Sequence, residues 1–162
     1  MPRSCPAKGA RCLGGNAYLE EGGFPLLYRE APVNAIWEGS GNVMCLDVLR
    51  AVEREPETLE RVLSAIEAAS GGEQRLKSAV EGGRIMLAEA VQDQTRARSA
   101  VELLALTAAG ALLQAHTPPV VSDAFLATRL YGAFRHSYGV GLGAAISKAL
   151  PRAPPRSWDE LI

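Results

Sequence analysis

Glu38 is the side chain whose surroundings best suit acid–base chemistry. It follows Trp37 within residues 34–50, N-A-I-W-E-G-S-G-N-V-M-C-L-D-V-L-R, and a small G-S-G step separates it from an apolar run that predicts a helix. Ser40 or Asn42 can cap that helix, because either side chain can accept a hydrogen bond from a first-turn amide. Local chemistry alone favours Glu38 as an ordinary acid at a helix start, and it leaves open a second interpretation as a positioned base.

Breaks in the hydrophobic pattern divide the chain into helices, and no segment has the pattern of a strand. Gly82 and Gly83 fall inside one predicted helix, which indicates either a bend or a close helix contact there. The segment at residues 97–115 is apolar nearly all round, which is typical of a buried central helix. We therefore predict an all-α protein, an antiparallel helical bundle with short connections. The expected helices cover residues 25–36 (kinked or shortened by Pro32), 41–55, 57–70, 73–95, 97–115, 120–138 and 139–150.

The composition is that of an ordinary soluble domain. The 162 residues suit one domain, with 48% hydrophobic and 22% charged side chains. The net charge of -1 gives no overall field that would attract nucleic acid or a membrane. No apolar run reaches the roughly 18 residues that a membrane span needs, and the N-terminus has no apolar core of a signal peptide. We therefore expect no membrane association.

The cysteines and histidines do not form a metal-binding pattern. Cys5, Cys12 and Cys45 are odd in number and contain no C-x-x-C pair, which favours a reducing, cytoplasmic setting over a disulfide framework. His116 and His136 lie far apart, and neither has a second ligand four residues on. We predict no metal site.

Two weaker patterns remain. G-V-G-L-G-A at residues 139–144 matches the dinucleotide fingerprint, but a predicted helix precedes it where the fingerprint requires a strand, so we reject it. Residues 99–156 carry five basic and two acidic side chains, a balance of +3 without the histidines. Such a face could contact DNA phosphates, although a solvated helix surface is the more ordinary interpretation.

Three motifs resemble the C-terminal part of the acyl-CoA dehydrogenases. They are L-G-G-N-A-Y at residues 13–18, Y-R-E at residues 28–30 and I-W-E-G-S-G-N at residues 36–42. The longer stretch at residues 32–50 is very similar to the AidB-like branch of that family, which is linked to the adaptive response to alkylation. The later helices, to about residue 142, fit the extra C-terminal helices of that branch.

The resemblance implies a domain layout. Residues 11–150 would form the helical C-terminal domain of the family with its extra helices, between flexible tails at residues 1–10 and 151–162. Members of the family usually also have an N-terminal helical domain and a β-barrel domain, which these 162 residues do not contain. We therefore expect a truncated member, or one part of a split protein, that is inactive without those domains.

The resemblance also implies a reaction and a cofactor. The family desaturates an acyl-CoA thioester between its α and β carbons and transfers the hydride to FAD. Glu38 matches the base that removes the α-proton, and its backbone N–H matches the group that helps to bind the thioester oxygen. The positions that contact the flavin in the family also match Trp37, Ser40 and Asn42.

Gly14 and Gly15 match glycines that approach the ADP portion of an FAD molecule held by a neighbouring subunit. The resemblance thus implies a homo-oligomer that binds FAD and acyl-CoA. The alternative hypothesis is a binding module, in which the helices serve for oligomerisation or for DNA binding in an AidB-like alkylation-response protein.

Overall fold

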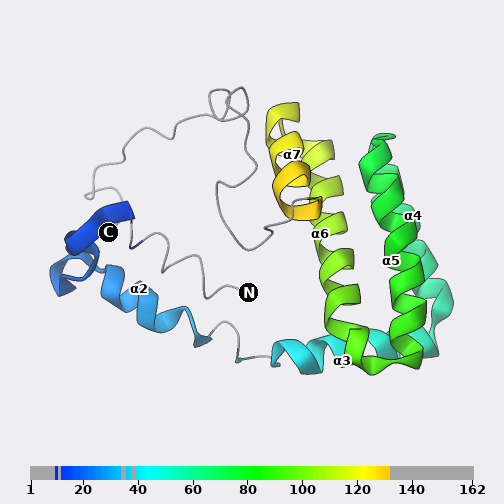
Figure 1. The fold of residues 1–162 in the computed structure, drawn as a ribbon, viewed down its shortest axis with the longest axis horizontal. Coiled ribbons are helices and arrows are strands. Elements are labelled where there is room, and N and C mark those ends of the chain that lie inside the picture. Colours follow the sequence, from blue (N-terminus) through cyan, green and yellow to red (C-terminus); the bar gives the residue numbers. More distant parts are fainter. Residues whose placement is uncertain (1–9, 11, 34–35, 38, 132–162) are drawn as a thin grey trace. The chain divides into compact units, whose positions relative to one another are not determined.

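The computed structural model describes residue 10 and residues 12–33, 36–37 and 39–131 (Figure 1). These residues form helices and turns, and none of them lies in a strand, so the predicted all-α class is confirmed. Apart from Ala10, the two predicted tails lie outside the described residues, as does the helix expected at residues 139–150. In chain order, the elements are η1 (Gly14–Ala17), η2 (Glu20–Gly22), α2 (Phe24–Glu30), α3 (Gly41–Arg54), α4 (Pro56–Ala69), α5 (Gln74–Gln92), η4 (Gln94–Arg96), α6 (Ala97–His116), α7 (Pro119–Phe125) and the π-helical η5 (Leu126–Leu130).

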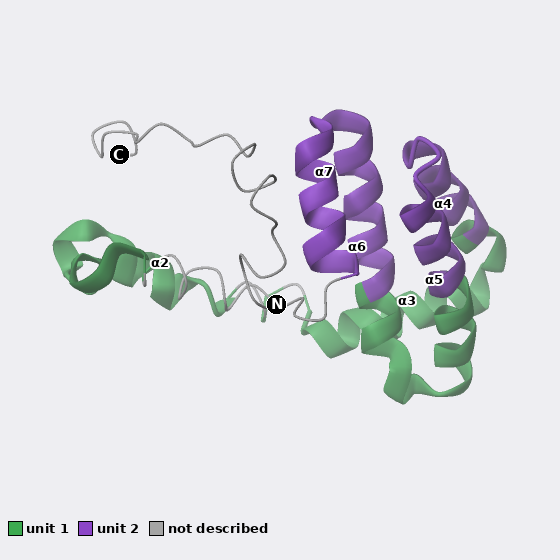
Figure 2. Cartoon of the chain, turned by 45° about the horizontal axis from the view of Figure 1, so that its top comes forward, with its two compact units in different colours: residues 1–59, 84–102 green, residues 60–83, 103–162 purple. Residues whose placement is uncertain are grey.

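The chain divides into two compact units (Figure 2). Unit 1 comprises residues 1–59 and 84–102, and unit 2 comprises residues 60–83 and 103–162. The helices α4, α5 and α6 each contribute residues to both units.

Unit 1 contains the motif segment and the helix that follows it. The helix α2 ends at Glu30, two residues before Pro32. Ala31 still has helical φ and ψ and its amide donates to the Leu27 carbonyl, but Pro32 has no amide hydrogen with which to continue the helical hydrogen bonds. The helix α3 is amphipathic, with Cys45 and Leu49 buried one turn apart on its inner face. The helix α3, which begins within the I-W-E-G-S-G-N motif, thus packs against the rest of unit 1 along an apolar stripe.

A rigid corner joins α5 to α6 within unit 1. The side chain of Asp93 accepts hydrogen bonds from the backbone N–H of Thr95 at 3.1 Å and from its hydroxyl at 2.6 Å. Arg96 forms ion pairs with Glu89 and, at 3.5 Å, with Asp93. These bonds lower the pKa of Asp93, chiefly through the hydrogen bond from the Thr95 hydroxyl. The first turn of α6 therefore starts from a fixed corner.

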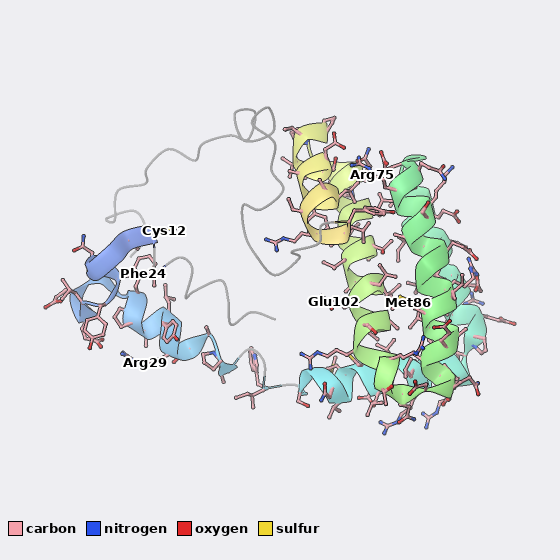
Figure 3. The ribbon with its side chains drawn as sticks, in the orientation of Figure 1. Cys12, Phe24, Arg29, Arg75, Met86 and Glu102 are labelled. Carbon is pink, nitrogen blue, oxygen red and sulfur yellow. The ribbon has the colours of Figure 1, made fainter. Side chains whose placement is uncertain are left out.

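Unit 2 is closed by a polar cluster at the N-terminal end of α5, where Figure 3 labels Arg75. The guanidinium of Arg75 donates to Glu73 at 2.8 Å and to Asp123 of α7 at 2.5 Å, and the Tyr131 hydroxyl donates to the Arg75 carbonyl. The hydrogen bond from Arg75 lowers the pKa of Glu73, and burial raises the pKa of Tyr131. The cluster holds α7 and η5 against α5.

A tight helix contact in unit 2 occurs at Gly110 of α6. A Cβ placed there would lie 2.9 Å from Cδ2 of Leu126 and 3.1 Å from Cδ2 of Leu76, and both leucines are completely buried. Of the two alternatives expected at Gly82 and Gly83, a bend or a close helix contact, the structure shows no close contact. The helix α5 includes both residues, and a Cβ at Gly82 would meet Leu103 at an ordinary 3.9 Å, while one at Gly83 would meet no described atom within 4 Å.

The helix α6 is less buried than its composition predicts. Thr107 and Ala111 are buried, but Leu112 is 56% exposed. The stretch Gln94–His116 is also long and apolar enough to cross a membrane by length and composition, with 22% of its most apolar window buried. Core helices of soluble proteins meet the same criterion of length and composition.

Gly110→Ala should lower the free energy of unfolding by about 1–3 kcal/mol, because the added methyl group overpacks a site walled by two buried leucines. Gly83→Ala is the matched control. It adds a methyl group to a helical glycine with open surroundings, so it should leave stability unchanged or raise it by up to about 1 kcal/mol. Urea denaturation of both variants gives the comparison, and equal stability of the two would contradict the close contact at Gly110.

Candidate functional site

The turn before α3 requires a glycine. Gly39 has φ +120, a conformation that residues with a Cβ rarely adopt, and a Cβ placed there would lie 3.0 Å from the sulfur of Met44. Glu38 itself lies outside the described residues, so its assignment stays a prediction. Its neighbour Trp37 is described and is 61% exposed. The backbone that follows Glu38 is therefore shaped by Gly39.

Ser40 stands at the N-cap of α3 but does not cap it with its side chain. Its backbone is extended, with φ -68 and ψ 152, and its carbonyl accepts the first helical hydrogen bond, from the Met44 amide at 3.0 Å. The side-chain cap expected from Ser40 or Asn42 is therefore not present. The first-turn amides lie at the positive end of the helix dipole, and the Ser40 hydroxyl is not engaged by them.

Asn42 is bound by a residue that sequence reasoning did not identify. Its Oδ1 accepts a hydrogen bond from Nη1 of Arg98 at 2.7 Å, across 56 residues of chain. The guanidinium also lies against Gly41, where a Cβ would come within 3.7 Å of Nη2. Nothing in the sequence distinguishes Arg98 from neighbouring arginines, because the contact depends on the corner that joins α5 to α6.

Gly14 and Gly15 lie in the short helix η1, and both are exposed. Gly14 has φ +59, and a Cβ at either glycine would meet no described atom within 4 Å. The backbone here is therefore open to close approach by another molecule. Such openness is what a contact with the ADP portion of a dinucleotide requires.

Gly14 also lines an open, mostly apolar pocket of about 860 Å³. Glu20 and Arg29 form a two-point ion pair at its edge, with distances of 2.9 and 3.1 Å, and Figure 3 labels Arg29 on α2. The hydrogen bond between them lowers the pKa of Glu20 and raises the pKa of Arg29. Trp37, Ser40 and Asn42 are not among the lining residues, which are Ala10, Gly14, Ala17, Tyr18, Glu20, Pro25, Tyr28 and Arg29.

The predicted site residues therefore fall into two groups. One is the pocket at Gly14, and the other is the start of α3. Within the part of the chain that the structure describes, no group of three His, Cys, Asp or Glu side chains could hold a metal ion. Of the cysteines described, Cys12 is exposed and Cys45 is buried, and both are free thiols.

Comparison with known proteins agrees with the motifs. Residues 4–53 match the family model of the acyl-CoA dehydrogenase C-terminal domain. The chain is 34% identical over 119 residues to putative acyl-CoA dehydrogenase AidB of Escherichia coli (strain K12), which covers 74% of this chain. It is 34% identical over 129 residues to acyl-CoA dehydrogenase family member 11 of Caenorhabditis elegans, which covers 68% of this chain. The predicted resemblance is confirmed: the chain corresponds to the C-terminal part of an acyl-CoA dehydrogenase of the AidB-like kind.

The chain spans about a fifth of the length of these relatives, 22% of AidB and 21% of the C. elegans protein. The family-model match ends at residue 53, within α3. The two relatives cover more of the chain than the family model does. The helices α4 to α7 therefore lie beyond the domain that the family model describes.

Gly39→Ala should destabilise the chain by about 1–3 kcal/mol, because alanine must adopt a strained positive φ and its methyl group meets Met44. Gly15→Ala is the control, since it adds the same methyl group at an open position without a positive φ. Thermal and urea unfolding measure both variants. Equal unfolding curves would contradict the requirement for glycine at residue 39.

Proposed function

We propose that this chain supplies the catalytic base and part of the flavin site of an acyl-CoA dehydrogenase-type enzyme. The observation that carries the proposal is the I-W-E-G-S-G-N motif at residues 36–42, whose last two residues begin α3. The match of residues 4–53 to the family's C-terminal domain supports it. The substrate would be an acyl-CoA thioester, and the cofactor would be FAD.

The described residues fit part of a dinucleotide site. The start of α3 offers the Ser40 hydroxyl, the Asn42 amide and first-turn backbone N–H groups, which suit the oxygen-rich groups of a dinucleotide. Gly14 and Gly15 offer a second, exposed stretch of open backbone. Since these two groups of residues do not line one pocket, we propose that each contributes to a different flavin site in an oligomer.

The proposed role of Glu38 is to accept the α-proton of the acyl thioester. Proton removal from carbon requires a carboxylate held in line with that carbon, and its rate depends on the accuracy of that position. The Glu38 backbone N–H would donate to the thioester oxygen as negative charge develops on it. Bound FAD would accept the hydride from the β-carbon.

Exposed apolar side chains support assembly with other chains or domains. Soluble monomers rarely expose large apolar side chains in groups, because their burial in an interface is favourable. The 18–44 segment has many of them, each between 44% and 86% exposed: Tyr18, Leu19, Leu26, Leu27, Tyr28, Val33, Ile36, Trp37, Val43 and Met44. We propose that this segment is covered in the complete enzyme, and that the chain alone does not catalyse the reaction.

The other hypotheses stay predictions. Of the five basic residues in residues 99–156, four lie beyond the described residues, so the structure adds nothing to the proposed DNA contact. The cytoplasmic location rests on the cysteine count alone.

Glu38→Gln should lower the rate of flavin reduction by acyl-CoA about 10²–10⁴-fold, the usual contribution of a positioned base. The assay uses this chain joined to the preceding part of the E. coli relative, which supplies the rest of the site. Stopped-flow bleaching of the flavin absorbance band measures the rate in the loaded protein.

Glu53→Gln is the matched control, because it removes an exposed carboxylate from the same helix-and-turn segment outside the motif. It should leave the reduction rate unchanged. Equal rates for wild type and Glu38→Gln, with equal flavin content, would remove Glu38 from the mechanism.

A further inference from the structure

The contact between Arg98 and Asn42 joins α6 to the start of α3. Both residues belong to unit 1, which includes α3 and the first turns of α6 (Figure 2). The Nη1–Oδ1 distance is 2.7 Å, and the guanidinium also lies over Gly41. One side chain from α6 thus binds Asn42 and occupies the space next to Gly41 in the first turn of α3.

Arg98 starts from a fixed position. Ala97 and Ala100, on either side of it, are 4% and 0% exposed, so the first turn of α6 is packed. The corner before it is held by Asp93 and Arg96 through the bonds described above. The backbone that carries Arg98 is therefore held by buried alanines and by the hydrogen-bonded corner, and the arginine can orient its partner.

The chemistry of the pair fixes the orientation of the Asn42 amide. A guanidinium has five N–H donors and no acceptor, so it can bind only the carbonyl oxygen of an amide. With Oδ1 held by Arg98, the amide nitrogen occupies the other branch of the planar group. We infer that Arg98 is a positioning residue that keeps the Asn42 NH₂ group available as a donor to the flavin dinucleotide.

This inference rests on the proposed function, in which the start of α3 contacts the dinucleotide. Phosphate and ring carbonyl oxygens are acceptors, so they bind an amide through its nitrogen and not through its oxygen. Without Arg98 the amide can turn over and present Oδ1, which would oppose these acceptors. Arg98 would therefore select the ligand-binding orientation, although it lies on a helix outside the family's C-terminal domain model.

Two substitutions separate orientation from charge and packing. Arg98→Glu replaces donors by acceptors, so the carboxylate should bind the Asn42 NH₂ group and turn the amide over. Arg98→Lys keeps a donor-only side chain, so it should preserve the wild-type orientation. Arg54→Glu is the control, because it makes the same charge change at an exposed position at the far end of α3.

The first readout is the side-chain NH₂ signal of Asn42 in ¹⁵N NMR spectra of the full chain, assigned with Asn42→Ser. In Arg98→Glu, exchange of these protons with water should slow at least about threefold, because a carboxylate now accepts from them. In Arg98→Lys and Arg54→Glu, the signal should resemble wild type. The same signal in all four proteins would overturn the inference.

The second readout is FAD titration of this chain joined to the preceding part of the E. coli relative, which supplies the rest of the flavin site, followed by the change in flavin fluorescence. Arg98→Glu should weaken binding at least about tenfold, and Arg98→Lys should stay within about threefold of wild type. Equal loss in Arg54→Glu, or no loss in Arg98→Glu, would overturn the inference and leave the proposed function intact. If the joined wild-type protein shows no saturable FAD binding, the proposed flavin contact at α3 fails, and the inference fails with it.

Discussion

A hydrogen bond from Arg98 to Asn42 connects the functional motif to the helices that follow it. The helix α3 also packs along an apolar stripe that buries Cys45 and Leu49. Because a helix held along one stripe can still shift at its end, the position of its first turn depends on a contact at that end. Arg98 supplies this contact, and the position of the residues directly before α3 depends on it.

The later helices thus have a structural purpose that the motif alone does not reveal. The α5–α6 corner fixes where α6 begins, and close packing at Gly110 fixes what α6 contacts in unit 2. Neither feature belongs to the residues that the family model describes, which end at residue 53. The aligned stretches of the two relatives, 119 and 129 residues long, are longer than the family-model match of residues 4–53.

Much of the fold could be predicted from the sequence, because helix periodicity and glycine or proline breaks are local properties. The tertiary contacts could not be predicted from the sequence, because they join residues that lie far apart in it. The pair Gly82 and Gly83 predicted a close contact or a bend in α5, yet the tight contact is at Gly110. That contact is formed by two buried leucines, Leu76 of α5 and Leu126 of η5, which lie in other elements. Likewise, Ser40 matched a capping pattern but makes no side-chain cap. Arg98 binds Asn42 because the corner between α5 and α6 brings the start of α6 close to the start of α3, and the sequence does not predict that corner. Glu38 was identified by its motif, and its geometry lies outside the described residues.

The central claim is that this chain carries the base that removes a proton from the α-carbon of an acyl thioester. The most direct test is exchange of that proton with solvent, because exchange isolates proton transfer from the later hydride transfer. An acyl-CoA would be incubated in D₂O with the assembled enzyme, and deuterium at the α-carbon would be followed by NMR. The account predicts exchange with wild type and its loss with Glu38→Gln, whereas equal exchange with both proteins would contradict it.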